Sequence, residues 1–559
     1  MENKMIARTL RLLSQLMELQ EENPFKIKSV ANAAFKVDKS PVKISDLSLE
    51  QLEKVDGLGK SIALKVDELN RTGTIEELTQ LLALTPAGIV EMLSIKGLGP
   101  KKVQIIWKQL NIESIGELYY ACNENRLVEA KGFGLKTQEE IKKVIEFTMS
   151  NVGKLLYSQA EVLNDAILMG LNTIPSVNKV STAGQFARKC DIIDNLIFVL
   201  ETSNEAEVVS ILQNDENFAG SLTSENTWLG TYHNFSIELK FCNEADYAWN
   251  MFVSTSSETH LNEIANVKPL ESLKSLTTAE EIYKSVNWPY ILPELREDWN
   301  LEKLQSIDQQ NLIRLEDLKG TIHNHSTYSD GIHTLKEMAV YCKELGYEYL
   351  GICDHSKSAF YANGLTEDRL LLQHQEIDKL NQELAPFRIF KGIESDILYD
   401  GSLDYADEIL ASFDLVVASV HSLLKMTKEK ANERLIQAIE NPFTTVLGHP
   451  TGRLLLAREG YPIDHQLIID ACSANNVVIE LNANPLRLDL DWRWIDYALS
   501  KNVMISINPD AHRKEGYHDM KYGVNVARKG GLTKNMCFNA LSAVEIAEKF
   551  VSKKSLIKS

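Results

Sequence analysis

The chain has 559 residues, 44 % of them hydrophobic and 25 % charged, which is the balance of soluble globular protein and enough length for several domains. No apolar run approaches the ~18 residues of a membrane span, and the first residues lack the apolar segment of a signal peptide. The formal net charge of −19 excludes a protein that coats nucleic acid by bulk attraction, so any contact with DNA has to be local.

The cysteines bear on the cellular compartment. There are seven of them, an odd number, and they include no C-x-x-C pair, which favours reduced thiols. We therefore expect a cytoplasmic protein that is a monomer and makes no membrane contact.

A G-x-G motif recurs three times near the N-terminus, each time between two segments of helical periodicity. The glycine pairs are Gly57 and Gly59, Gly97 and Gly99, and Gly132 and Gly134. Two glycines let the backbone turn tightly and bring its N–H groups against an anion at the start of the next helix. Basic residues follow the motifs, among them Lys60 and Lys101. Each motif predicts a helix-hairpin-helix that grips a DNA phosphate without reading sequence, with a plain helix-helix turn as the alternative.

Residues 1–150 resemble the lyase-type helical domain and fingers of family X DNA polymerases. The resemblance lies in Asn23-Pro-Phe-Lys-Ile-Lys-Ser-Val-Ala-Asn-Ala-Ala and in Leu84-Thr-Pro-Ala-Gly-Ile-Val-Glu-Met-Leu. It implies a lyase-like domain over 1–80 and fingers over 81–150. Lys65 falls where that family can carry a Schiff-base lysine that removes a 5′-deoxyribose phosphate. A solvated helix lysine is the alternative, because Ser61 replaces a neighbouring lysine common in the eukaryotic relatives.

Residues 151–295 resemble the palm and thumb of the same family, but the catalytic pattern is broken. A family X palm reads G-S-x-R-R and then G-D-x-D, because two carboxylates two apart on a strand face the same way and jointly hold magnesium ions. Here Asn195 and Ile197 occupy the two carboxylate positions. Gln185 replaces the serine, while the third carboxylate maps to Glu238. The resemblance therefore predicts a palm-like fold without polymerisation.

Two aspartates close to these positions do not restore the pattern. Asp191 and Asp194 are three residues apart, and strand geometry would place them on opposite faces. We therefore expect that they do not substitute for the missing pair.

Seven short apolar stretches between residues 318 and 515 end in potential metal ligands. A helix-length amphipathic segment follows each stretch, which favours buried parallel strands in βα units. In a closed βα barrel, groups at the C-terminal ends of the strands gather at one rim. The ten side chains at these ends are His323, His325, Asp354, His355, Glu394, His421, His449, Glu480, Asp510 and His512.

The donor types indicate a hydrolase that holds several metal ions. Imidazole and carboxylate together suit zinc, manganese or iron. His323 and His325 are two apart on a strand, so both rings point to one face and can chelate one ion. Asp330 lies in the following loop, and Glu394 can bridge two ions. Two or three metals ~3.5–4 Å apart activate a water and hold both oxygens of a phosphoester. For any one histidine, a satisfied buried hydrogen bond is the alternative.

Two arginines lie just past the rim positions. Arg453 and Arg487 are placed where a guanidinium fork can clamp a phosphate, with a surface arginine in a polar loop as the alternative. Together with Glu394 and Asp510 they are the candidate catalytic residues.

Residues 318–545 resemble a PHP (polymerase and histidinol phosphatase) phosphoesterase domain. Its nine-ligand pattern matches His323, His325, Asp330, His355, Glu394, His421, His449, Asp510 and His512. The resemblance implies a distorted seven-stranded barrel with a trinuclear site. The implied groups are His323, His325, Glu394 and Asp510, then Glu394, His421 and His512, then Asp330, His355 and His449.

Nearly the whole chain thus resembles the bacterial and archaeal family X polymerase fused to a PHP domain, which would occupy 296–559. The expected fold is multidomain: an α-helical helix-hairpin-helix region, an α+β nucleotidyltransferase-like palm and the PHP barrel. We expect a metal-dependent DNA phosphodiesterase of repair, a 3′–5′ exonuclease or an enzyme of abasic and blocked 3′ ends, acting on gapped, nicked or 3′-end DNA. The alternatives are an active gap-filling polymerase, a PHP phosphatase of a small molecule, and a noncatalytic DNA-end-binding scaffold.

Overall fold

The computed structural model describes residues 1–40, 42–95, 97–128, 130–150, 153–223 and 226–555. Lys96, in the second G-x-G segment, lies outside these ranges. The chain divides into two compact units, Met1–Glu146 and Phe147–Ser559. None of the helices within the described ranges is long and apolar enough to cross a bilayer.

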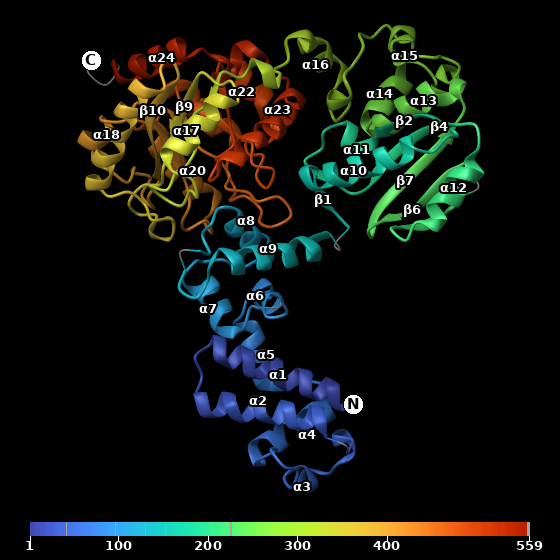
Figure 1. Ribbon diagram of the computed structural model, residues 1–559, viewed down its shortest axis with the longest axis vertical. Helices are drawn as coiled ribbons and strands as arrows, with labels where there is room; N and C mark the ends of the chain where they lie inside the picture. The colour runs from blue at the N-terminus through green and yellow to red at the C-terminus, as the bar shows by residue number, and fades with distance from the viewer. Residues whose placement is uncertain (41, 96, 129, 151–152, 224–225, 556–559) are drawn as a thin grey trace. The chain divides into compact units, whose positions relative to one another are not determined.

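The first unit is all helical (Figure 1, blue to cyan). Helix α1 buries Leu10, Leu13 and Met17, and it packs on α2, which buries Val30 and Val37. The helices are α1 (Asn3–Leu19), α2 (Pro24–Lys39), α3 (Leu49–Leu52), α4 (Lys60–Thr72), α5 (Glu76–Ala83), α6 (Ala87–Met92), α7 (Pro100–Lys108), α8 (Ile115–Asn123) and α9 (Leu135–Ser150), which runs on into the second unit.

The second unit begins with a mixed sheet in the order β2-β4-β7-β6-β5, in which β4 and β7 are parallel and the other neighbours antiparallel. Its strands are β2 (Val177–Ala183), β4 (Leu196–Thr202), β5 (Phe218–Leu222), β6 (Thr227–Tyr232) and β7 (Phe235–Cys242). A separate pair joins β1 (Leu155–Leu156) and β3 (Ile192–Ile193). The helices of this region are α10 (Tyr157–Asn172), α11 (Gly184–Ala187), α12 (Glu205–Asn214), α13 (Glu244–Thr255), α14 (Glu258–Val267), α15 (Ala279–Ser285) and α16 (Leu301–Ser306).

Seven parallel strands in the order β14-β13-β12-β11-β10-β9-β8 form the rest of the second unit. They are β8 (Gly320–Thr321), β9 (Tyr349–Ile352), β10 (Arg388–Asp396), β11 (Leu415–Ser419), β12 (Val446–Leu447), β13 (Val478–Asn482) and β14 (Ile505–Asn508). A parallel bridge between Asn324 and Ala511 joins the chain just beyond the two edge strands, so the sheet is a nearly closed barrel. The seven strands predicted from the apolar stretches are confirmed.

Helices surround this barrel, as Figure 1 shows in yellow to red. They are α17 (Leu335–Glu344), α18 (Glu367–Glu383), α19 (Asp407–Leu410), α20 (Lys428–Glu440), α21 (His465–Asn475), α22 (Trp492–Ser500), α23 (Met520–Lys529) and α24 (Ala543–Ser555). Helix α24 adds Ile546 and Phe550 to a buried cluster with barrel residues such as Val446 and Val478, near the start of their strands. The opposite ends of the strands are therefore the ones that carry the polar side chains.

Candidate metal centre

All nine predicted ligands lie in one buried region at the C-terminal ends of the barrel strands. Each ligand except Asp330 lies on a barrel strand or within four residues of its C-terminal end, and Asp330 lies in the loop that follows β8. Eight of the nine residues are at most 5 % exposed, and the side chain of His421 is 4 % exposed. Nine polar side chains buried together need partners, because burial of an unpaired polar group is costly.

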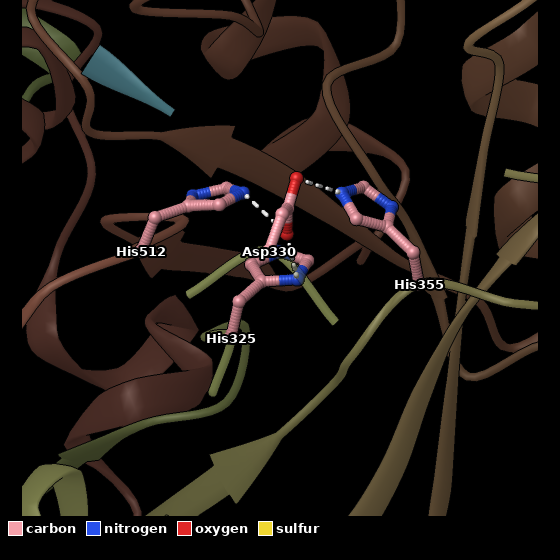
Figure 2. Close-up of side chains that lie close together, drawn as sticks. All are labelled: His325, Asp330, His355 and His512. Carbon is pink, nitrogen blue, oxygen red and sulfur yellow. Dashed lines mark ion pairs between the residues drawn. The ribbon is translucent and has the colours of Figure 1, made fainter. Parts of the chain in front are cut away.

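A first group surrounds Asp330 (Figure 2). Asp330 Oδ1 lies 3.3 Å from His512 Nε2, and Asp330 Oδ2 lies 3.5 Å from His355 Nε2. His325 Nδ1 lies 3.9 Å from Asp330 Oδ1. The four candidate donor atoms lie within 4.8 Å of one another, a spacing that can hold a metal ion.

Two further groups adjoin the first. In one, His325 Nε2 is 2.9 Å and His323 Nε2 is 3.6 Å from Asp510 Oδ1. In the other, His355 Nδ1 lies 2.9 Å from Glu394 Oε2, and His421 Nε2 lies 3.0 Å from Glu394 Oε1. Because His325 and His355 each belong to two groups, the three groups form one continuous cluster.

Glu394 is the most shared carboxylate of the cluster. Its Oε1 lies 3.0 Å from Nε2 of His449 and 3.3 Å from Nε2 of His323, in addition to its contact with His421. This position agrees with a bridging role, although the donors are grouped differently from the partition that the resemblance implies. His512 lies with Asp330 and His355, and His449 lies against Glu394. Strand order did not fix the partition, because each loop can turn its side chain toward either neighbour.

Charge keeps the carboxylates ionised. Burial alone would raise the pKa of Glu394, but the imidazoles of His421 and His323 hold it well below its usual value. Asp330 and Asp510 likewise have pKa values far below the ordinary one, despite burial, because of neighbouring histidines. Burial lowers the pKa of His325 to about 3, with His512 and His355 adding to the effect. The same carboxylates raise the pKa of His323 and His355 well above the usual value, despite burial. Carboxylates bind metals when ionised and imidazoles when neutral, so metal binding at these two histidines would release protons.

The hydrogen bonds also fit a metal centre. Within the described part of the chain, the buried cluster atoms that make no hydrogen bond of suitable geometry include His323 Nε2, His325 Nδ1, both ring nitrogens of His355, His449 Nδ1, Asp330 Oδ2 and Glu394 Oε2. Each such atom would cost about 1–3 kcal/mol if it stayed unsatisfied. Metal coordination satisfies such atoms, so the donor set fits the two or three divalent ions expected from the sequence.

Two carboxylates outside the predicted ligand set orient the imidazoles. Glu480 Oε1 accepts a hydrogen bond from His323 Nδ1 at 2.7 Å, and its Oε2 accepts from the His449 backbone N–H at 2.8 Å. Asp396 accepts from His421 Nδ1. Such partners fix the ring orientation of a ligand. The sequence placed Glu480 among the ten potential ligands at the strand ends, whereas Asp396 was given no role, although it lies two residues after Glu394 on β10, on the same face.

Comparison with known proteins places these features in a family. A profile for a Helix-hairpin-helix domain matches residues 1–75, one for a SAM-like Helix-hairpin-helix tandem matches 89–146, and one for the PHP domain matches 321–484. The protein named DNA polymerase/3'-5' exonuclease PolX, from Bacillus subtilis (strain 168), is 33 % identical over 565 residues, covering 98 % of this chain and 99 % of that protein. The chain belongs to the PolX family.

Shorter similarities connect this PolX chain to proteins named as phosphatases. A probable phosphatase of Acetivibrio thermocellus is 30 % identical over 167 residues, or 29 % of this chain and 63 % of that protein. A probable phosphatase of Clostridium novyi is 25 % identical over 165 residues, with the same two shares. Asp510 and His512 lie beyond the segment that the PHP profile matches, yet the fold returns them to the cluster.

The two rim arginines of the PolX chain have different surroundings. Arg487 is buried, with Nε 4.0 Å from Asp510 Oδ2, so it lies at the cluster. Arg453 instead donates hydrogen bonds to the backbone oxygen of Arg487 and to Asp491, and it also pairs with Asp191. A phosphate-clamping role for Arg453 stays a prediction, and in this structure its guanidinium is held by partners from distant parts of the sequence.

The three G-x-G segments adopt the same turn. Gly57, Gly97 and Gly132 have φ of 86°, 94° and 94°, a left-handed conformation that favours glycine. The residue after each of them donates its N–H to the carbonyl oxygen three positions back, at 3.0, 3.0 and 3.1 Å. Gly59 and Gly99 are the N-caps of α4 and α7, and Gly134 directly precedes α9. The first N–H groups of a helix have no intrahelical acceptor, so each turn can present amides to a phosphate.

The lysines near the first two turns differ in their surroundings. Lys60 and Lys101 are exposed in the first turns of α4 and α7. Lys65 is mostly buried and its ammonium pairs with the carboxylate of Glu77. A Schiff-base role for Lys65 stays a prediction.

The residues at the carboxylate positions of the family's palm pattern lie on β4 and β7 or directly beside them. Ile197 on β4 is the register partner of Glu238 on β7, and its side chain packs against Gly184. Gln185 exchanges two hydrogen bonds with Asp194, both 2.8 Å long. Asp191 directly precedes the two-residue strand β3, and Asp194 directly follows it. Neither residue lies on β4, the strand that carries Ile197.

Proposed function

We propose that this chain is a metal-dependent DNA phosphodiesterase of repair that removes nucleotides from 3′ ends. Nine metal-type donors form one buried cluster in a PHP barrel, and the same chain carries three helix-hairpin-helix turns. The similar protein of Bacillus subtilis is named as both a polymerase and a 3'-5' exonuclease, which supports the proposal. The observation that carries it is the cluster, because a buried donor set of this size has no use in a binding scaffold.

The side chains of the cluster would have different roles in hydrolysis. Asp330, Glu394 and Asp510 are the ionised donors around which the imidazoles lie. Bound there, two or three ions of manganese, zinc or iron would activate a water and hold the attacking and leaving oxygens of a phosphodiester. Arg487 lies beside Asp510, where its fixed positive charge can balance a phosphate oxygen.

Loss of polymerase activity is part of the proposal. The register partners Ile197 and Glu238 supply one carboxylate where the family expects two, and Asn195 adds only an amide. Asp194 is held by Gln185 and lies 3.3 Å from Lys154. A single remaining carboxylate cannot hold two divalent ions against their hydration.

A small-molecule phosphatase is the second candidate, favoured by the similarity to the probable phosphatases. Such an enzyme would not need the first unit with its phosphate-binding turns. Metal analysis of the purified chain, followed by digestion of a 3′-labelled primer–template with and without manganese, separates the two. We expect bound metal and manganese-dependent release of the label as a nucleotide. Metal-dependent hydrolysis of small phosphate esters with intact DNA would favour the phosphatase.

We predict that changing Gly57 and Gly97 to valine weakens the use of DNA but not the chemistry. A β-branched residue cannot adopt φ near 90° without strain, and at Gly57 a Cβ would lie 2.7 Å from Lys36 Cγ. We expect the KM for duplex DNA to rise about tenfold, the loss of about 1.4 kcal/mol of binding. Steady-state kinetics should show little change for bis-p-nitrophenyl phosphate.

Gly73→Val is the matched control. Gly73 also has a positive φ, of 79°, and lies in the same unit, but it ends α4 and belongs to no G-x-G turn. An equal loss on both substrates, or the same rise in KM for Gly73→Val, would assign the effect to folding and not to a phosphate grip.

A further inference from the structure

The guanidinium of Arg453 ties two rim loops of the barrel together. Nε donates to the Arg487 carbonyl oxygen at 2.9 Å, Nη1 donates to Asp491 at 2.6 Å, and Nη2 donates to the Leu488 carbonyl oxygen. Arg453 itself follows β12, whereas its partners follow β13. One side chain therefore fixes the spacing of two neighbouring loops.

Both loops lead directly to the metal centre. Thr451, two residues after the candidate ligand His449, is held by Asp489 of the second loop through its N–H and its hydroxyl, at 2.9 and 2.8 Å. Arg487 in that second loop lies 4.0 Å from Asp510. A shift of either loop would therefore move groups at the cluster.

The backbone around the cluster needs such support. His449, Leu488 and Asp510 have φ of 22°, 46° and 52°, a region that residues other than glycine rarely adopt. Conformations of this kind persist only where the surrounding structure over-determines them. Two of these three residues are candidate ligands, so the contacts that hold the loops bear on the ligand geometry.

The fourth partner of Arg453 comes from the palm. Asp191 Oδ2 lies 3.3 Å from Arg453 Nη2, and the side chains are 13 % and 16 % exposed. Asp191 lies between α11 and β3, 262 residues away in the chain. Removal of one partner from an ion pair that is this well buried destabilises the fold, because the other charge is left buried without a partner.

This ion pair is part of a wider complementary interface. Basic side chains of the barrel region meet carboxylates of the palm and of the connecting segment. The pairs are Arg453 with Asp191, Lys521 with Glu161, Arg528 with Glu294, and Lys529 with Glu297. One buried apolar cluster also runs from palm residues such as Phe198 to barrel residues such as Ile505. The two parts of the second unit are therefore packed as one body.

We propose that Asp191 is a positioning residue for the metal centre: by holding Arg453, the palm fixes the two rim loops that carry His449 and Arg487. The palm would then be retained because the nuclease site needs it. The activity arm of the test rests on the proposed function, whereas the metal-binding arm does not.

The test compares two aspartates of the palm in the full chain. Asp191→Asn keeps the shape and removes the charge, and Asp194→Asn is the matched control because Asp194 is 49 % exposed and its ion-pair partner is Lys154. We expect Asp191→Asn to weaken manganese binding, measured by calorimetry, and to lower kcat on primer DNA, each by about three- to thirtyfold. The KM for DNA should not change, and Asp194→Asn should behave as wild type.

Two further variants separate positioning from loss of stability. Arg453→Gln combined with Asp191→Asn should be no worse than Arg453→Gln alone, because Asp191 acts through Arg453. If Asp191→Asn does not fold, Asp191→Leu with Arg453→Met keeps the interface packed without the charges and should still bind manganese more weakly.

The outcomes distinguish this proposal from the proposed function. Wild-type manganese affinity and kcat in folded Asp191→Asn, or in the Leu–Met pair, would overturn the positioning role. An equal loss in Asp194→Asn would also overturn it. If the wild type digests no DNA but Asp191→Asn still weakens manganese binding, the positioning role stands and the proposed substrate is wrong.

Discussion

Glu394→Gln is expected to lower the rate of DNA hydrolysis by more than about a hundredfold, beyond the loss typical of residues that only orient a ligand. The carboxylate has imidazole nitrogens of His421 and His449 3.0 Å from one oxygen and His355 Nδ1 2.9 Å from the other. Glutamine keeps the shape but loses the charge that these donors share. Digestion of labelled primer, measured with saturating manganese, gives the rate.

DNA affinity should stay at the wild-type level, because the G-x-G turns belong to the other unit of the chain. Glu433→Gln is a suitable control, since Glu433 lies on α20 with 67 % of its side chain exposed. If Glu394→Gln digests DNA at the wild-type rate, the metal centre does not need the Glu394 carboxylate. A parallel loss of DNA affinity would point to misfolding.

The palm gives the second large effect: no nucleotide should be added to a gapped primer with magnesium or with manganese, although the same primer is shortened. Asn195 and Ile197 stand at the carboxylate positions, and neither can offset the charge of a triphosphate or bind two divalent ions. Incubation of a labelled gapped primer with all four deoxynucleotides, resolved by length, measures this. Restoring aspartate at both positions should not suffice, because Gln185 binds Asp194 where the family has a serine.

A catalytically active palm would be recognised by its response to two substitutions. Template-dependent extension that Glu238→Ala abolishes and His323→Ala leaves intact would show that the catalytic pair lies elsewhere. Asp191 and Asp194 would then be tested, although the first pairs with Arg453 and the second with Lys154.

Local sequence patterns were sufficient where local geometry decides the structure. Apolar stretches that are short and lack polar alternation predicted seven buried parallel strands, and the rim rule then predicted that His323 and Asp510 meet although 187 positions separate them. The G-x-G spacing predicted three turns, because only glycine readily adopts the positive φ seen at Gly57 and its counterparts. The division into domains at residues 80 and 295 stays a prediction.

Contacts between side chains that lie far apart in the chain could not be predicted from the sequence. The loop sequence around Arg453 suggests that this residue binds a phosphate. No neighbouring residue in the chain indicates that Arg453 forms an ion pair with Asp191. The grouping of His512 with Asp330 and the role of Asp396 also depend on side-chain directions that strand order leaves open. These features arise from packing between loops, which periodicity does not encode.

The most direct test of a 3′-end nuclease in the PHP barrel is the product ladder of a 5′-labelled primer–template incubated with manganese, comparing the wild type with His323→Ala/His325→Ala. Both histidines are fully buried in the cluster, and His325 belongs to two of its groups. We predict stepwise shortening from the 3′ end by the wild type, no products above the primer length, and no shortening by a double variant that still binds the DNA. Shortening by the double variant at the wild-type rate would contradict the assignment of hydrolysis to this site.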